Sequence, residues 1–444
     1  MNKVLTMRMI PALMLFGFAG VASAAGFAIQ NQTGSGNGNA FSGAAAAAED
    51  AGTIYFNPAG MTYLSEGHNI SGSGTLLSRS IKYKDTGTFT RAGVIAPPNI
   101  TVYAPTGDGG NAGGLALIPS GYWAYSLSQS LRIGVGVSPT FGNETEYDKN
   151  FRGFNAGFYG AMEQININPS IAFKLNEMVS LGAGVNFAHN ETQFKFGVPV
   201  QSPTPAVGAP AGAYVDVKGD DWATGYNLGA MFQLSPSTRV GLTYRSNTKF
   251  HLEGKQKVSA TGATLTALGV VNQDIKATLD MPDSASLAVS QKLSDRWDML
   301  GDFTWTGWSS IDDVGLKNKQ TGALIKTLSY NFQDTYRIGL GANYRYSDAW
   351  KLRFGIAYDK SPVKSAADRS MTLPDSDRTW LSFGAKYTLS KAASLDFGYS
   401  HIFFKDARTA RDVTNSTGVV LQTVNGKWDN NSADLLSVQY NHAF

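Results

Sequence analysis

Apolar and polar side chains alternate every second residue through much of this chain. In YRIGLGANYRYS (residues 336–347), Tyr336, Ile338 and Leu340 alternate with Arg337 and Gly339. A period of two places the two sets of side chains on opposite faces of a β-strand. The same pattern recurs in RIGVGVS (132–138), SLGAGVNF (180–187), KLRFGIAYD (351–359), WLSFGAKYTL (380–389) and SLDFGYS (394–400). The sequence therefore predicts many strands, each apolar on one face only.

These strands indicate a transmembrane barrel. Aromatic residues gather at the strand ends, as in interfacial girdles, and the less apolar face carries glycine, serine and charge. After residue 24 no apolar run reaches the length of a membrane-spanning helix. A closed barrel is then the way to satisfy backbone groups in lipid. A soluble β-sandwich is the alternative, and its exposed face would be expected to carry ordinary Lys, Glu and Thr.

The connections predict the number of strands. Short turns are expected at 128–130, 176–177, 235–237, 294–295, 347–348 and 390–392, and long links at about 83–113, 145–161, 197–221, 255–272, 311–326, 360–377 and 407–427. Six short and seven long links alternate, so thirteen connections join fourteen strands. We therefore expect an all-β fold, a 14-stranded antiparallel outer-membrane barrel with short periplasmic turns and long external loops.

The two ends of the chain look different from its middle. Residues 1–24 combine Lys3 and Arg8, an apolar stretch and a final Ala-Ser-Ala, which indicates a cleaved signal peptide. Residues 25–66 do not alternate and precede the barrel, predicted for 67–444. The chain ends on Phe444, after Leu436, Val438 and Tyr440 at steps of two. This ending resembles the signal by which the bacterial assembly machinery recognises outer-membrane strands.

Residues 25–66, here called the hatch, are small and suit the lumen of the barrel. Inward-facing glycines would leave room for them, and Ser42 is expected to cap a short helix through Ala48. Asn57, Pro58, Ala59 and Gly60 suit a type I turn. We expect Glu49 and Asp50 to meet lumenal arginines such as Arg337 and Arg345.

Composition excludes several classes of function. The charge is nearly balanced, with 37 Lys+Arg against 34 Asp+Glu, so a nucleic-acid partner is not expected. There is no cysteine, and five histidines without paired-ligand spacing give neither a metal site nor a cofactor. No Ser/His/Asp grouping points to an enzyme. GSGNG at 34–38 lacks the Lys-Ser/Thr of a phosphate loop.

The hatch sequence AGFAIQNQTGSGNGNAFSGAAAAAEDAGTIYFNPAGMT resembles that of the outer-membrane long-chain fatty acid transport family (FadL type), which includes importers of aromatic hydrocarbons. The stretches YRIGLGANYRYSDAWKLRFGIAYDKSPV and LPDSDRTWLSFGAKYTLSKAASLDFGYS resemble the family's C-terminal strands. The resemblance covers essentially the whole chain after the signal. It implies a monomeric barrel, plugged by its N-terminus, through which hydrophobic molecules diffuse without an energy source.

Apolar external loops are candidates for substrate capture, because exposed apolar patches usually mark interaction sites. The resemblance implies a capture groove between two loops, which carry Val198 and Val200 on one and Leu265, Leu268 and Val271 on the other. Self-packing of these loops is the alternative. An aromatic group in the preceding loop lines the groove or braces the rim: Phe151, Phe154 and Phe158.

For a deeper pocket, Phe27 corresponds to the family's buried N-terminal segment. A fatty acid also needs a cation. Arg337, Arg345 and Arg353 face inward by parity, although they can equally pair with Glu49, Asp50 or Asp359. Gln333 stands where fatty acid carriers of the family tend to have a basic residue, which leaves room for a neutral hydrocarbon.

The third strand contains Pro139, which cannot donate to the sheet ladder. Pairing must therefore break there, at a bulge or an inward kink, and Gly142 eases the bend. In the resembling family a kink in this strand opens the wall sideways into the lipid. We therefore expect a lateral exit at Ser138, Pro139 and Gly142; a purely structural bulge is the alternative.

The expected function is passive uptake of hydrophobic molecules across the outer membrane, most simply long-chain fatty acids. An importer of neutral aromatic hydrocarbons is the alternative, followed by a general porin. The expected partners are the hydrophobic substrate, outer-membrane lipid and lipopolysaccharide, and the assembly machinery.

Overall fold

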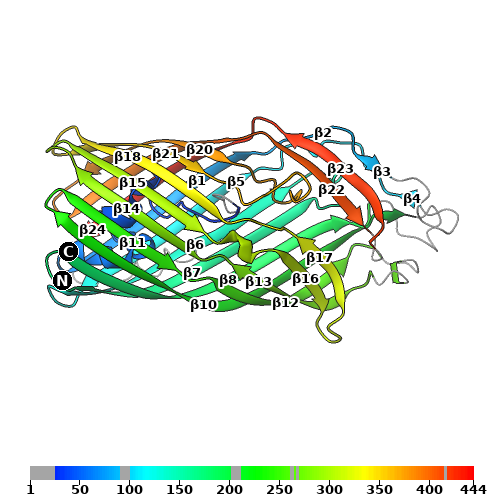
Figure 1. The fold of residues 1–444 in the computed structure, drawn as a ribbon, viewed down its shortest axis with the longest axis horizontal. Helices are drawn as coiled ribbons and strands as arrows, with labels where there is room; N and C mark the ends of the chain where they lie inside the picture. Colours follow the sequence, from blue (N-terminus) through cyan, green and yellow to red (C-terminus); the bar gives the residue numbers. More distant parts are fainter. Residues whose placement is uncertain (1–25, 91–100, 202–211, 261–264, 267–269, 415–417) are drawn as a thin grey trace, which may run out of the picture.

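A computed structural model describes residues 26–90, 101–201, 212–260, 265–266, 270–414 and 418–444. Fourteen antiparallel strands close a barrel, as the sequence predicts (Figure 1). The uninterrupted strands are β1 (His68–Ser80), β5 (Leu115–Ser126), β6 (Leu131–Glu146), β7 (Tyr159–Lys174), β8 (Val179–Gly197), β10 (Tyr214–Ser235), β19 (Trp350–Asp359), β20 (Arg378–Thr388), β21 (Ala393–Phe404) and β24 (Ser432–Ala443).

The other four strands are interrupted near the external side. Each consists of two pieces in sequence, namely β11 (Thr238–Arg245) with β12 (Thr248–Val258), β13 (Gln273–Met281) with β14 (Ser284–Lys292), β15 (Trp297–Thr306) with β16 (Asp313–Asn318), and β17 (Leu324–Ser329) with β18 (Thr335–Arg345). A short 3-10 helix, η4 (Trp308–Ser310), lies in the break between β15 and β16.

The barrel closes where its first and last strands pair. β24 runs antiparallel to β1, from Asn69 opposite Ala443 to Ser80 opposite Ser432. The alternation along β18 has the predicted sense, because Leu340 is 56% exposed on the outer face whereas Arg337 is 5% exposed on the inner face. The wall is therefore apolar outside and polar inside.

All six predicted short turns join consecutive strands, and they gather at the end of the barrel where the C-terminus lies (Figure 1). The long links lie at the opposite end. Two of them were predicted partly wrongly. Residues 311–326 mostly continue the wall as β16 and β17, which pair from Asp313 opposite Ser329 to a tight turn, and residues 214–221 of the predicted link 197–221 belong to β10. Lys326 has the same parity as Leu324 and Leu328, so the alternation is broken there and the pattern predicts a loop.

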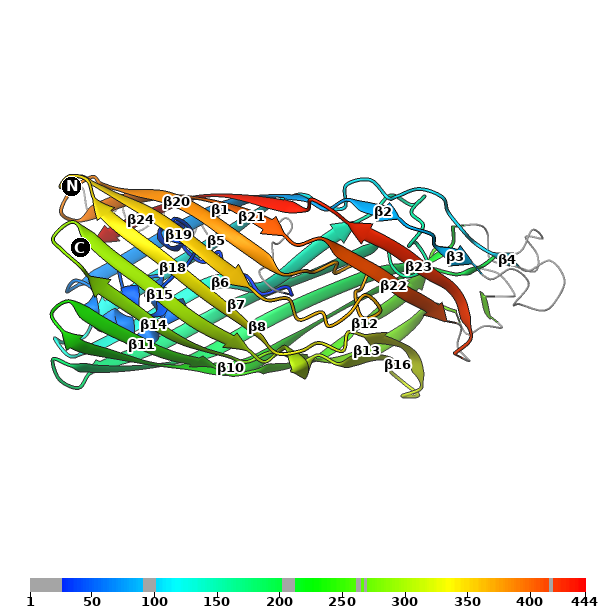
Figure 2. The same cartoon turned by 45° about the horizontal axis from the view of Figure 1, so that its top comes forward.

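The external end also carries its own small sheets (Figure 2). One consists of β2 (Tyr83–Asp85), β3 (Phe89–Thr90), β22 (Ala407–Thr414) and β23 (Val420–Trp428), and another of β4 (Thr101–Val102) and β9 (Val200–Gln201). The predicted link 407–427 is thus largely a hairpin.

The N-terminal segment folds into short helices against the inner wall. They are α1 (Gly34–Asn37), α2 (Ala44–Ala47), α3 (Thr53–Phe56) and the 3-10 helix η3 (Pro58–Tyr63). α1 contacts β20, β21 and β24, whereas η3 contacts β7, β8 and β10 across the barrel. None of the helices in the described residues is long and apolar enough to cross a membrane. The predicted signal peptide lies outside the described residues.

Two local predictions for the hatch need correction or extension. Ser42 does not cap a helix through Ala48; α2 starts after Gly43, whose φ of 67° is left-handed, and it receives no side-chain cap. The turn at Asn57 is present and continues as η3, with the Asn57 side chain accepting from the backbone N–H of Ala59.

Candidate functional site

A largely apolar cavity of about 810 Å³ lies in the external half of the barrel. Its walls come from β7, β8, β10, β12, β13, β16 and β17, with Phe27 of the hatch and the segment around Leu373. The apolar lining residues include Met162, Val217, Leu252, Ile275, Leu279, Ile311, Leu316, Leu328 and Tyr330. Such a lining suits an apolar small molecule.

Phe27 forms part of the cavity wall and is held by other aromatic rings. It is 5% exposed, and its ring lies edge-on to Trp308 at 4.8 Å and to Phe141 at 6.2 Å between centroids. Trp308 belongs to η4, whereas Phe141 belongs to β6. The start of the hatch, residues 26–29, here called the tip, thus contacts two opposite parts of the wall beside the cavity.

The tip also pairs with the backbone of β6. The N–H of Ile29 donates to the carbonyl of Thr140 at 2.9 Å, and the N–H of Gly142 donates to the carbonyl of Phe27 at 2.7 Å. Pairing between β6 and its neighbour β5 extends only from Ser126–Arg132 to Gly121–Val137. The tip therefore occupies the place on β6 that β5 leaves free.

The predicted irregularity at Pro139 is present. The register between β6 and β7 shifts between Pro139 and Phe141, which marks a bulge at Thr140. On the other side of the gap, Pro119 of β5 has no N–H to offer. Sequence reasoning missed Pro119, although a proline in each of two adjacent strands is a readable signal for a break between them. Whether substrate leaves beside Ser138 and Gly142 stays a prediction.

Gln32 of the hatch spans the separation between β5 and β6. Its side-chain amide donates to the carbonyl of Pro139 at 2.6 Å, and its side-chain oxygen accepts from the Tyr122 hydroxyl at 2.8 Å. Ser120 donates to its backbone carbonyl at 2.5 Å. Gln32 thus satisfies the backbone carbonyl of Pro139 and binds two side-chain hydroxyls of β5. Sequence reasoning did not predict this contact.

Three cations lie beside the apolar cavity. A neighbouring cavity of about 690 Å³ shares Phe194, Leu328, Tyr330 and Thr372 with it and is also lined by Lys195, Lys326, Arg411 and Asp412. The Lys326 ammonium lies 4.3 Å from the centre of the Phe196 ring. Within the described residues neither Lys326 nor Arg411 forms an ion pair with a carboxylate. Arg411 donates to backbone carbonyls, including that of Ser329 at 2.8 Å, and the Lys195 ammonium lies over the Tyr159 ring.

Lys326 lies in the external β16–β17 hairpin, where Asp313, Lys317 and Thr327 are exposed on the outer face, outside the apolar belt. Burial of its ammonium, and then the nearby Arg411 guanidinium, lower the pKa of Lys326 to about 8. Both causes disfavour the charged form. A bound anion would stabilise the charged ammonium against both. Sequence reasoning missed Lys326 because it fell in the stretch read as a loop.

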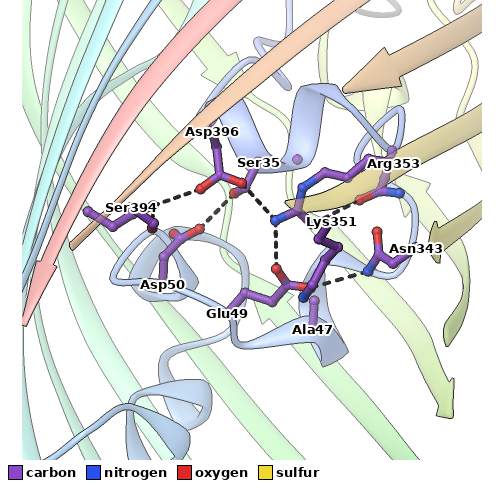
Figure 3. A network of polar contacts seen from close by, with 12 residues as sticks. Ser35, Ala47, Glu49, Asp50, Asn343, Lys351, Arg353, Ser394 and Asp396 are labelled. Atoms are coloured by element: carbon purple, nitrogen blue, oxygen red, sulfur yellow. Dashed lines mark hydrogen bonds and ion pairs between the residues drawn. The ribbon is translucent and has the colours of Figure 1, made fainter. Parts of the chain in front are cut away.

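At the other end of the barrel, an ionic network holds the hatch (Figure 3). Arg353 of β19 donates to Glu49 at 2.7 Å and to Asp396 of β21 at 2.8 Å. Lys351 lies 3.4 Å from the same Glu49 carboxylate. Burial alone would raise the pKa of Glu49, but Arg353 and Lys351 hold it well below its usual range. We call Glu49, Arg353, Lys351 and Asp396 the anchor.

The other hatch residues also have fixed partners. Asp50 accepts from the Ser35 hydroxyl at 2.7 Å, and burial followed by the nearby Asp396 raises the pKa of Asp50. Asn57 donates to the carbonyl of Ala230 on β10 at 3.1 Å. Pro58 and Ala59 lie so close to Gly182 that a Cβ at that glycine would be 2.3 Å from the Ala59 nitrogen. Close approach requires glycine there.

The predicted lumenal arginines divide among different roles. Arg337 faces inward but donates to Asp302 at 2.9 Å and to the carbonyl of Ala40, and it does not line the apolar cavity. Arg345 is exposed at the short-turn end, so the prediction that it meets Glu49 or Asp50 was wrong. Arg353 takes that place. The alternation along β18 correctly identified Arg337 as inward-facing, but it failed for Arg345, the last residue of the strand.

The predicted capture residues are only partly within the described residues. Val198 and Leu265 are buried in one cluster with Ile275 and Leu316, both of which line the apolar cavity. This is the self-packing arrangement. Val271 accepts from the Gln256 side chain through its carbonyl, Leu268 lies outside the described residues, and Val200 lies in β9. A role in capture stays a prediction for all five.

Phe151, Phe154 and Phe158 are buried in another cluster, together with Tyr147 and Trp428 beneath the external hairpin. Tyr147 and Phe151 stack at 4.0 Å, and Phe154 and Phe158 at 4.6 Å. Such packing matches a brace of the barrel rim. Among the described residues, no group of three or more His, Cys, Asp or Glu side chains could hold a metal ion.

Comparison with known proteins agrees with this architecture. Residues 15–444 match the family described as outer membrane protein transport protein (OMPP1/FadL/TodX). The long-chain fatty acid transport protein of Escherichia coli K12 is 29% identical over 415 residues, covering 86% of this chain and 88% of that protein. A putative outer membrane protein of Neisseria meningitidis is 31% identical over 444 residues, covering 90% and 91%.

Two solved structures share the fold. A Pseudomonas aeruginosa FadL homologue superimposes with a TM-score of 0.83 at 24% identity, covering 94% of this chain and 99% of that chain. The Ralstonia pickettii toluene transporter TbuX superimposes with a TM-score of 0.66 at 20% identity, covering 94% and 100%. The match over nearly the whole sequence, on a barrel of the predicted strand number, shows that the chain belongs to the OMPP1/FadL/TodX family of outer-membrane transport proteins.

Proposed function

We propose that this protein takes up long-chain fatty acids passively across the outer membrane. Substrate is captured at the external loops, binds in the apolar cavity and leaves sideways at the bulge in β6. Relatives at about 29% identity are named long-chain fatty acid transport proteins, which supports this substrate class.

The observation that carries the proposal is the apolar cavity joined to Lys326 and Arg411. A fatty acid needs both parts. Burial of its alkyl chain contributes about 25 cal/mol per Å². Its carboxylate would form charge-assisted hydrogen bonds with cations that otherwise lack an acidic partner within the described residues.

A neutral aromatic hydrocarbon is the second candidate, and one observation favours it: neither Lys326 nor Arg411 lines the apolar cavity itself. A small apolar ring would fill that cavity without reaching them. Gln333 gives no further cation, because its side-chain amide is neutral; the amide donates to the carbonyl of Ser361.

Binding of palmitate and of hexadecanol to the purified barrel separates the two candidates. Lys326→Met should weaken palmitate binding roughly tenfold or more, because hydrogen bonds to charged groups contribute about 1.5–3 kcal/mol. Hexadecanol binding should not change. Lys319→Met is the matched control, since Lys319 pairs with Glu253 on the outer surface. Equal palmitate affinity in wild type and Lys326→Met, with tight toluene binding, would favour the hydrocarbon.

The exit is tested separately. Pro139→Thr with Gly142→Val rebuilds a regular strand, so β5 and β6 should pair along their length and transport should stop. The folded state is checked by heat-modifiable migration in gels. A straightened barrel that folds and imports as fast as the wild type would contradict lateral exit.

A further inference from the structure

A further cavity, of about 530 Å³ and here called the second cavity, lies on the other side of the tip from the apolar cavity, which is here called the first. Asn143 and Leu373 line both cavities, whereas Phe27 lines the first and Gly26 lines the second. The tip is therefore part of the partition between them. If the tip moves aside, the two cavities become one compartment.

Arg79 of β1 lines this second cavity and is nine-tenths buried. One guanidinium nitrogen, Nη1, donates to the Asn143 side chain at 2.9 Å, and Nη2 donates to the carbonyl of Glu144. Nε has no hydrogen-bond partner among the described residues. A guanidinium has five N–H donors, and a buried one without an acid leaves donors and charge unsatisfied.

Within the described residues, the acids nearby do not form an ion pair with Arg79. Asp375, which also lines the cavity, is paired with Arg378 and accepts from the Ser361 hydroxyl at 2.6 Å. Glu144 gives Arg79 its backbone carbonyl, and its carboxylate is near enough for its charge to favour the charged guanidinium.

Apolar packing continues from this cavity to the separation between β5 and β6. Leu77 and Leu435 line the cavity and belong to a buried cluster that also contains Ile29, Ala116 and Ile118. Ala116 and Ile118 lie on the part of β5 that has no partner in β6. Ile29 is the tip residue bonded to Thr140 at the bulge. The cluster thus lies between the second cavity and the bulge.

From this arrangement we propose a second binding site, specific for an alkyl carboxylate, in which Arg79 receives the carboxylate and the cavity behind the tip receives part of the chain. The site rests on the proposed function and extends it. It holds the acid after it passes the tip and before it leaves at β6. At this site Arg79 takes over from Lys326 as the ionic partner of the carboxylate. The carboxylate therefore has a cation at both ends of its path through the apolar region.

Uptake by cells that express the full-length protein and have no other route for these compounds tests the proposal. Arg79→Met should slow palmitate uptake by about tenfold, from loss of hydrogen bonds to a charged group, and should leave hexadecanol uptake within about twofold of wild type. Arg79→Lys should restore most of the palmitate rate. Arg152→Met, which removes an external arginine beside Asp85, is the matched control. Heat-modifiable migration checks that each variant folds.

A structural role predicts a different result, because Arg79 also ties β1 to β6. Equal slowing of palmitate and hexadecanol by Arg79→Met would mean that Arg79 only holds the wall, and it would overturn the inference. An unchanged palmitate rate would do the same. Palmitate binding in the first cavity is measured in parallel. If it depends on Lys326 while Arg79 has no effect, the proposed function stands and only the second site fails.

Discussion

The hatch is held by different interactions at its two ends. Near Glu49 it is bound by buried ion pairs, and around α1 by hydrogen bonds such as that from the Gly34 N–H to Gln439 at 2.7 Å. At the tip, the side-chain contacts are apolar, with aromatic rings around Phe27 and an apolar cluster around Ile29. The polar contacts are two backbone hydrogen bonds to the bulged part of β6 and one from the Gly26 N–H to Asp375 at 3.2 Å. Ion pairs between buried groups are costly to break one at a time, whereas edge-to-face aromatic contacts contribute about 0.5–1.5 kcal/mol each.

From this difference we propose that the two ends of the hatch have separate roles. The anchor would keep the hatch inside the barrel and exclude polar solutes. The tip would leave β6 and the cavity wall without disturbing the anchor. A substrate that replaces the Phe27 contacts would open the route toward β6 while the barrel remains closed to ions and sugars.

The largest effect on conductance is expected from removing the tip and the anchored part of the hatch together. Deletion of residues 26–60 should raise the conductance for small ions and sugars many-fold, because the segment packed against the inner wall is gone. Planar bilayer recordings measure this, and gel migration shows whether the barrel still folds. Conductance equal to that of the wild type would mean that the segment does not close the lumen.

Breaking the anchor alone should have the next largest effect. Arg353→Met leaves Glu49 and Asp396 buried without their cation, and loss of one partner from a buried pair costs about 3–5 kcal/mol. We expect a lower free energy of unfolding and a partial rise in conductance. Arg345→Met is the control, because Arg345 is exposed at the end of β18. If the two variants behave alike, the anchor does not stabilise the hatch.

A change at the tip should affect conductance least among the substitutions. Phe27→Ala removes a buried ring and its contacts with Trp308 and Phe141, and we expect a loss of about 3–5 kcal/mol in unfolding free energy. Conductance for sugars should stay low, while palmitate uptake changes because the partition is altered. A leak as large as that of Arg353→Met would contradict the separation of roles.

The smallest effects are those of pH. The pKa of Glu49 is held below its unfolded value of about 4.3. Its contribution to stability is therefore complete above that value and is lost only as pH falls through the lower, folded pKa. Lys326 acts on binding instead: palmitate affinity should decline above about pH 8, as the ammonium is lost. An affinity that is flat from pH 7 to 10 would exclude Lys326 from the carboxylate site.

Much of the wall could be predicted from the sequence because lipid imposes a strict alternation on each strand. The six short turns and the proline bulge follow from residues that act locally, such as Pro139. Prediction failed where strands extend beyond the lipid. There β16 and β17 are exposed to water on one side, so their alternation is weak and they were read as a loop.

The candidate site was predicted less well, since it depends on contacts between distant segments. Parity showed that Arg337 and Arg353 face inward. It could not show that Asp302 reaches Arg337 from the neighbouring strand, or that Asp396 reaches Arg353 from two strands away. Apolar loop residues were expected to be exposed, although Val198 and Leu265 pack on the barrel extension. The cation beside the cavity, Lys326, became visible only once β17 was placed.

The most direct test of the account is a pair of distances measured with and without palmitate. The chain has no cysteine, so spin labels can be attached at Ala28→Cys in the tip or Ala48→Cys beside the anchor, each with a reference label at Ser390→Cys in a periplasmic turn. Palmitate should shift or broaden the distance distribution from Ala28 and leave that from Ala48 unchanged. Movement of both labels together, or of neither under saturating palmitate, would contradict a fixed anchor with a mobile tip.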